Sequence, residues 1–138
     1  MNNKSMIKDI LVYIENHLEE DLMLDKIAKE LNYSKFYIER TFSEKIGCSL
    51  YKYIQKRRLT EAARKLVETD KSIVEIAYEA QYSSQQAFTF AFKKFYLCTP
   101  QVYRQRGIFY PKQSRIITQS KIYNWIISNA CLGGRMVA

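Results

Sequence analysis

Two groups of residues have the types and the spacing needed to bind the base edges of DNA. The first group is Lys35, Phe36, Glu39, Arg40 and Ser43, and the second is Gln85, Gln86, Thr89, Phe90 and Lys93. Residues three and four positions apart lie on one side of an α-helix, so each group would share a helix face. Such a helix can enter the major groove of DNA, where each base pair presents a distinct pattern of donors and acceptors.

The residue types in these groups match particular base contacts. Arg40 can donate two hydrogen bonds to guanine, and Gln85 or Gln86 can bind adenine in the same bidentate manner. Phe36 and Phe90 are apolar groups at positions that would otherwise face water, and contact with thymine methyl groups would explain them. Because Phe90 lies in a phenylalanine-rich segment, it could equally be a core residue.

Basic and hydroxyl side chains beside these residues are expected to bind phosphates, which contribute affinity and register but no sequence information. The expected phosphate-binding residues are Lys35, Ser43, Ser84, Lys93 and Lys94. Glu39 would repel phosphate, so it either accepts a hydrogen bond from cytosine N4 or pairs with Lys35 or Arg40.

The two groups lie in two copies of one repeated segment, residues 24–46 and 73–95. Ile27 and Ala28 recur as Ile76 and Ala77, and Ser34 and Phe42 recur as Ser84 and Phe92 after a one-residue insertion in the second turn. Each copy has a short apolar-periodic run, a polar turn, and a second run that starts at a serine suited to capping a helix. The pattern predicts a helix-turn-helix, present twice.

Hydrophobic periodicity predicts an all-α fold of about seven helices, arranged as two homeodomain-like helix-turn-helix subdomains. The predicted helices cover residues 6–18, 24–31, 35–46, 50–68, 73–80, 84–96 and 100–106. We expect a DNA-binding domain over residues 1–107, with units at about 6–47 and 72–106 joined by a linker helix at 49–69. A helix of this length spans roughly 30 Å, close to the roughly 34 Å between successive major-groove faces on one side of DNA.

Positive charge is concentrated in the second half of the 138-residue chain, whose net charge is +8. Residues 1–79 hold fourteen basic and fourteen acidic residues, whereas residues 80–138 hold eight basic residues and no acidic one. Segregated positive charge is typical of a surface that binds a polyanion such as nucleic acid. An anionic membrane surface would also fit this charge. No run of eighteen apolar residues and no signal peptide occurs, so we expect a cytoplasmic protein that is not exported and does not span a membrane.

The sequence offers no candidate for a metal site, a cofactor site or a catalytic site. Cys48, Cys98 and Cys131 lack the spacing of a zinc site or a disulfide framework, so we expect reduced packing residues. His17 is the single histidine and lies on a predicted scaffold helix. The Pro-Cys-His-Arg motif of DNA-repair alkyl transferases is also missing. We therefore predict a protein that is not an enzyme.

Residues 108–138 carry weaker signals. Residues 110–114 are typical of a linker, and residues 116–132 are apolar without a clear period. This basic tail could form a helix, or it could be the first strand of a domain that is missing here.

Two segments resemble the AraC/XylS family of bacterial transcription regulators, in particular its stand-alone MarA and SoxS type. They are SKFYIERTFSEKIGCSLYKYIQKRRLTEAARKL and IVEIAYEAQYSSQQAFTFAFKKFYLCTPQVYR. The resemblance covers residues 6–106 and implies a monomer that reads two adjacent major-groove segments of a promoter and contacts RNA polymerase. By position, it implies base contacts from Phe36, Glu39, Arg40, Gln85, Gln86, Thr89 and Phe90. The sequence departs from the family at Phe90, where arginine is frequent, and at Leu97, where glycine is frequent.

We therefore expect a sequence-specific DNA-binding transcription regulator that activates promoters. Two alternatives remain open at this stage. The chain could be a module that binds nucleic acid without sequence preference or binds another protein, or it could be the DNA-binding fragment of a larger ligand-sensing regulator.

Overall fold

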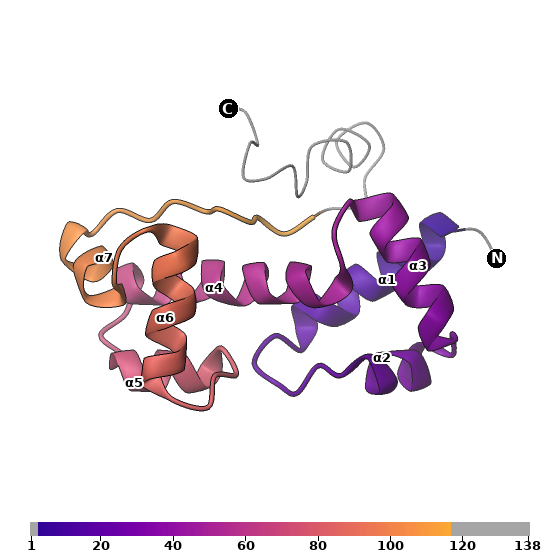
Figure 1. The fold of residues 1–138 in the computed structure, drawn as a ribbon, viewed down its shortest axis with the longest axis horizontal. Helices are drawn as coiled ribbons and strands as arrows, with labels where there is room; N and C mark the ends of the chain where they lie inside the picture. The colour runs from indigo at the N-terminus through magenta and orange to yellow at the C-terminus, as the bar shows by residue number, and fades with distance from the viewer. Residues whose placement is uncertain (1–2, 117–138) are drawn as a thin grey trace. The chain divides into compact units, whose positions relative to one another are not determined.

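The computed structural model describes residues 3–116 and is helical over that range, which confirms the predicted all-α class (Figure 1). Seven helices and no strand occur within the described residues. The helices are α1 (Asn3–Asn16), α2 (Leu24–Leu31), α3 (Lys35–Ile46), α4 (Leu50–Glu68), α5 (Ile73–Glu79), α6 (Gln85–Tyr96) and α7 (Pro100–Arg106). The bounds of α2 to α7 agree with the predicted ranges to within one residue.

The described residues form two compact units. Unit 1 holds the residues up to Ile54 together with Arg115 and Ile116, and unit 2 holds Gln55–Ser114. Helix α4 starts in unit 1 and continues into unit 2 without interruption. Each unit contains one helix-turn-helix, formed by α2 and α3 in unit 1 and by α5 and α6 in unit 2.

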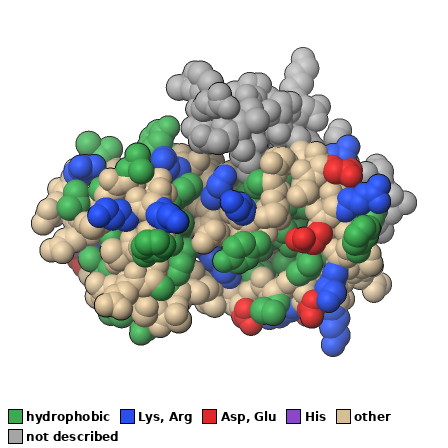
Figure 2. Space-filling view, in the orientation of Figure 1, with side chains coloured by type: hydrophobic (Ala, Val, Ile, Leu, Met, Phe, Trp, Pro, Cys, Tyr) green, Lys and Arg blue, Asp and Glu red, His purple; other side chains and the backbone are tan. Residues whose placement is uncertain are grey.

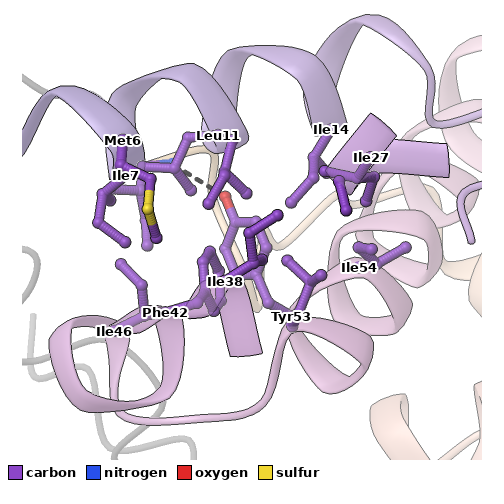
Figure 3. Close-up of a cluster of buried hydrophobic side chains, with 14 residues drawn as sticks. Met6, Ile7, Leu11, Ile14, Ile27, Ile38, Phe42, Ile46, Tyr53 and Ile54 are labelled. Atoms are coloured by element: carbon purple, nitrogen blue, oxygen red, sulfur yellow. Dashed lines mark hydrogen bonds between the residues drawn. The ribbon is translucent and has the colours of Figure 1, made fainter. Parts of the chain in front are cut away.

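The core of unit 1 forms where α1, α2, α3 and the start of α4 bring their apolar stripes together. Figure 3 shows these side chains pointing toward one another from the four helices. The fully buried members with the largest volumes are Met6, Ile7, Ile10, Ile14, Ile27, Ile38, Phe42, Ile46 and Tyr53. Burial of side chains of this size is the main favourable contribution to folding, so this core fixes α3 against its supporting helices.

Helix α1 ends at Asn16, two residues earlier than predicted, and starts three residues earlier, at Asn3. The ring nitrogen Nδ1 of His17 donates to the backbone carbonyl of Tyr13 at 2.7 Å, and the two rings stack with centroids 4.0 Å apart. That carbonyl would otherwise accept from the backbone N–H of His17 in a continuing α-helix. The N–H of His17 bonds instead to the carbonyl of Ile14, which closes the helix. The predicted end at Leu18 is therefore wrong because a side chain competes with the backbone.

The core of unit 2 is aromatic and centres on Phe92. Its ring lies 5.6 Å from that of Phe88, 4.9 Å from that of Tyr96 and 5.4 Å from that of Tyr103, measured between centroids. Phe88 and Phe92 have no exposed surface. Aromatic pairs at these separations add to the hydrophobic term, so the inward face of α6 is firmly specified.

Helix caps confirm most of the predicted boundaries. The hydroxyls of Ser34, Ser84 and Thr99 each accept a hydrogen bond from the backbone N–H three residues later. Asn32 and Gln81 take the left-handed conformation, with φ of 65° and 69°, at equivalent points of the two turns. The extra residue of the second turn therefore lies after Tyr82, between the shared tyrosine position and the capping serine.

Leu97 ends α6 in the left-handed conformation, where the family often has glycine. Its φ is 64°, its N–H bonds to the carbonyl of Lys93, and its side chain is 79% exposed. Replacing Leu97 by glycine should raise the free energy of unfolding by about 0.5–1 kcal/mol. Relief of the left-handed backbone gains roughly 1–2 kcal/mol, and the greater chain entropy of unfolded glycine takes back roughly 0.5–1 kcal/mol. Urea denaturation would measure this. A loss of stability would mean that the leucine side chain contributes contacts that its exposure does not indicate.

Helix α5 is tied to α4 by Glu79, whose two carboxylate oxygens accept from Lys65 at 2.8 Å and from Lys71 at 2.6 Å. Burial acts to raise the pKa of Glu79, but the bonds and charges of the two lysines outweigh it, so the pKa lies below the usual 4.5. A lowered pKa means that the folded state favours the ionised carboxylate, so the contribution to stability is present above pH 4.5 and lost below it.

The variant Glu79→Gln should therefore be less stable than the parent at neutral pH, by about 1 kcal/mol for a partly exposed pair of contacts. The difference between the two proteins should shrink as pH falls through the lowered pKa of Glu79, below 4.5. Denaturant titrations of both proteins from pH 7 to pH 3 would check this. A difference that stays constant over the range would show that the ionised form is not what stabilises α5.

The residues after α7 differ from the predicted linker, because hydrogen bonds hold them to unit 2. Tyr96 donates its hydroxyl to the carbonyl of Tyr110 at 2.8 Å, and burial raises the pKa of Tyr96, which keeps that hydroxyl protonated. The buried guanidinium of Arg57 donates to the carbonyl of Gln113 at 2.7 Å, and the N–H of Gln113 donates to the hydroxyl of Thr60 at 3.1 Å. We call residues 108–114 the strap; Figure 1 shows it (orange) following the part of α4 that belongs to unit 2.

Ile116 belongs to unit 1, where it is buried and its N–H donates to the hydroxyl of Tyr53 at 3.3 Å (dashed line in Figure 3). Residues 117–132, the apolar part of the predicted tail, lie outside the described residues.

The expectation for the cysteines is correct for Cys98 and wrong for Cys48. Cys98 is buried with a free thiol, whereas Cys48 is disulfide-bonded. The expectation rested on wide separation along the sequence, which does not limit distance in space.

Among the described helices, none has the length and hydropathy required to cross a membrane.

Candidate nucleic-acid interface

Helix α3 presents the predicted residues on the side opposite its core face. Ile38, Thr41, Phe42 and Ile46 are buried, whereas the predicted contact residues Lys35, Phe36, Glu39, Arg40 and Ser43 are all exposed. Phe36 is 75% exposed, which is unusual for a phenylalanine, because large apolar side chains are normally buried. The outward face therefore carries one apolar group, one carboxylate, two cations and one hydroxyl.

Both cations of this face are paired within unit 1. Lys35 Nζ lies 2.9 Å from a carboxylate oxygen of Asp25, and Arg40 Nε lies 3.3 Å from Glu44 Oε1. Lys35 and Arg40 were the two residues with which Glu39 was expected to pair if it did not meet a base. In the structure each of them lies beside another carboxylate.

Helix α6 presents the second group in the same way, with one difference. Gln85, Gln86, Phe90 and Lys93 are exposed, and Thr89 is half-buried. Phe90 is 67% exposed, so the alternative that it belongs to the core is wrong. Phe88 and Phe92, which lie four positions apart, take the inward positions. Phe90 lies two positions from each of them, so the helix period turns it outward.

The phosphate-binding candidates of unit 2 lie at both ends of α6. Lys94 Nζ lies 5.0 Å from the centroid of the Phe90 ring, in a cation–π contact, and Lys93 is exposed beside it. Ser84 is half-buried, and its hydroxyl oxygen accepts from the N–H of Ala87 at 3.1 Å. A hydroxyl that accepts one bond still has its proton to donate, so Ser84 can cap α6 and donate to a phosphate together.

Other cations of unit 2 have structural roles. Arg104 donates to the backbone carbonyls of Leu66, Thr69 and Lys71, at 2.8, 3.3 and 2.6 Å. Lys112 Nζ donates to the carbonyl of Phe95 at 2.8 Å. Figure 2 shows one face of the molecule, on which Lys and Arg dominate over unit 2 and acidic side chains appear mainly over unit 1.

Two ion pairs at these exposed faces were not predicted from the sequence. The pair of Arg40 and Glu44 has the i, i+4 spacing at which opposite charges meet on a helix, and this rule would have found it. The pair of Asp25 and Lys35 joins two helices, and no spacing rule predicts it. Over the described residues, no group of three or more His, Cys, Asp or Glu side chains is arranged to hold a metal ion.

The chain is similar in sequence to known proteins. A family model described as "Helix-turn-helix domain" matches residues 27–106. The Transposon Tn10 TetD protein of Escherichia coli is 43% identical over 105 residues, which cover 76% of each chain. The HTH-type transcriptional activator AarP of Providencia stuartii is 40% identical over 100 residues, covering 72% of this chain and 74% of AarP.

The crystal structure of a transcriptional regulator from Chromobacterium violaceum, one of the AraC-type DNA-binding domain-containing proteins, has the same fold. It superposes with a TM-score of 0.70 at 30% identity and covers 77% of this chain and 96% of that one. Two capped recognition helices, the helix-turn-helix model and these similarities lead to one conclusion: the chain belongs to the AraC/XylS family of DNA-binding transcription regulators.

Proposed function

We propose that this protein activates transcription by reading two adjacent major-groove segments of a promoter, one with α3 and one with α6. The observation that carries the proposal is that α3 and α6 each have an outward face of the same kind. On each, a serine-capped helix buries its apolar stripe and exposes groups able to bind base edges. Direct base contacts from a helix in the major groove are the usual source of sequence specificity.

In unit 1, Arg40 is proposed to bind guanine, Glu39 to accept from cytosine N4, and Phe36 to contact a thymine methyl group. Lys35 and Ser43, exposed at the two ends of this face, are proposed to contact phosphates. A bidentate contact contributes about 1–3 kcal/mol of discrimination against a wrong base, so Arg40 should dominate the specificity of this unit.

In unit 2, Gln85 or Gln86 is proposed to bind adenine, and Phe90 to contact a thymine methyl group, with Thr89 beside them. Lys93, Lys94 and Ser84 are proposed to bind phosphates. Because Phe90 stands where related proteins often have arginine, this unit should prefer an A·T-rich segment.

The presence of one helix-turn-helix in each of the two units supports a site with two separate informative segments. We infer that a single chain binds such an asymmetric site as a monomer, because each chain carries two recognition helices. We propose that it acts in the cytoplasm, on the nucleoid.

Activation is proposed from the similarity to AarP, which is described as a transcriptional activator. Activation by a protein bound at a promoter implies contact with RNA polymerase. We propose regulation through DNA binding alone, with no catalytic activity and no cofactor.

Selection of random duplex DNA by the purified protein, followed by sequencing of the retained fragments, tests the proposal. An asymmetric site with two informative segments about one helical turn apart is expected. One informative segment alone would contradict base reading by one of the two helices. Retention without enrichment of any sequence would contradict specific regulation and favour a module that binds nucleic acid without preference.

The variant Lys93→Ala should bind all duplexes more weakly and to a similar extent, because phosphate contacts do not depend on sequence. The slope of log affinity against log salt should become shallower by about one unit. Fluorescence anisotropy at several salt concentrations would measure both effects. The control is Arg106→Ala, which removes the same charge from an exposed position at the end of α7. An equal change of slope in the control would show that net charge, and not a contact of Lys93, is responsible.

A further inference from the structure

Arg40 makes an ion pair within its own helix. Its Nε donates to Oε1 of Glu44 at 3.3 Å, one turn further along α3. The two side chains are 67% and 63% exposed, so the pair adds little to the stability of the free protein. A carboxylate on a helix that approaches phosphates also opposes binding. Glu44 therefore needs an explanation other than stability or affinity.

The geometry of the guanidinium provides one. Arginine presents five N–H donors, and a bidentate contact uses either the two terminal Nη groups or Nε together with one Nη. Because Glu44 occupies Nε, the edge formed by the two Nη groups is left for a base. We propose that Glu44 is a positioning residue that holds Arg40 so that its two Nη groups meet guanine O6 and N7. The inference rests on the proposed base contact of Arg40.

The pair should strengthen when α3 enters the groove. Water is excluded there and the effective dielectric constant falls, so a charge-assisted hydrogen bond that is weak in solvent becomes stronger. A guanidinium that is already held also loses less side-chain freedom on binding DNA. Glu44 should therefore contribute more to the discrimination between guanine and other bases than to the free energy of unfolding.

The repeat supports this role. Arg40 and Glu44 of α3 correspond to Phe90 and Lys94 of α6, since Ser34 corresponds to Ser84 and Phe42 to Phe92. On α6, Lys94 Nζ again contacts the side chain one turn before it, 5.0 Å from the Phe90 ring centroid. Both recognition helices therefore place a partner one turn after the central outward residue. The acidic partner occurs in the unit whose outward residue is an arginine.

The test compares Glu44→Ala with Glu44→Gln, each in the full chain, on the selected duplex and on the same duplex with the guanine pair replaced. Glutamine keeps an acceptor oxygen at the same reach but carries no charge. Both variants should bind every duplex more tightly, because a negative charge is removed. Glu44→Ala should lower discrimination at the guanine pair at least about fivefold, whereas Glu44→Gln should keep it within about twofold.

Unchanged discrimination in Glu44→Ala would overturn the inference. The same loss in Glu44→Gln would also overturn it, because the acceptor oxygen would then not be what positions Arg40. The variant Arg40→Ala separates this inference from the proposed function. If Arg40→Ala keeps its base preference, the proposed base contact fails and the inference fails with it. If Arg40→Ala loses the preference and Glu44→Ala does not, only the role of Glu44 is wrong.

Discussion

Replacing Phe92 by alanine should lower the free energy of unfolding by about 3–5 kcal/mol, the usual cost of removing a fully buried phenylalanine. Phe92 has no exposed surface, and its ring contacts those of Phe88, Tyr96 and Tyr103. Urea denaturation followed by circular dichroism would measure the loss.

The matched control is Phe90→Ala, on the same helix but with a ring that is 67% exposed. It should change stability by no more than about 0.5 kcal/mol, as surface substitutions usually do. Under conditions where both variants stay folded, Phe90→Ala should lower the affinity for DNA more than Phe92→Ala does. The reason is that Phe90→Ala removes the proposed thymine contact, whereas Phe92→Ala removes no base contact. Similar losses of stability in the two variants would contradict the assignment of inward and outward faces to α6.

Replacing Arg40 by alanine should weaken binding to the best site by about 1–3 kcal/mol and remove the preference at one base pair. The physical reason is the loss of two parallel hydrogen bonds to guanine O6 and N7. Because Arg40 is exposed and its ion pair is weak in water, stability should hardly change. A competition assay with the four bases at each position of the selected site would locate the affected pair.

The control for this prediction is Lys45→Ala, which removes the same charge from the last turn of α3 at an exposed position. It should weaken binding to all sequences alike and leave every base preference intact. Equal preferences in both variants would remove Arg40 from the set of base-reading residues.

The helices and most of the outward faces were predictable because their causes are local. Caps, helix period and the repeat place α2 to α7. The outward position of Phe90 was left open by the sequence, because phenylalanines surround it on α6, and its 67% exposure in the structure decides it. The end of α1 was not predictable in this way, because it depends on the ring of His17 taking a backbone carbonyl.

The strap was missed for a different reason. Its sequence has neither helical nor strand periodicity, and its hydrogen bonds connect it to residues more than fifty positions away, such as Arg57 and Thr60. Pairing at that distance leaves no periodic signal. The contact of Lys35 with Asp25 also leaves no periodic signal in the sequence, because it joins side chains on two different helices.

The strap also decides where a fragment of this protein can be cut. A gene truncated after Gly107 would encode every helix of unit 2 but would remove the carbonyl of Gln113, and the guanidinium of Arg57, which is 3% exposed, would lose that acceptor. Arg57 would keep its bond to Glu61, but a hydrogen bond to a charged group contributes about 1.5–3 kcal/mol, so the shorter fragment should be less stable. Expression of the fragment to Ile116 instead keeps that acceptor and retains the apolar side chain that fills part of the core of unit 1. The shortest stable DNA-binding fragment should therefore include the strap and its hydrogen bonds, and should not end at α7.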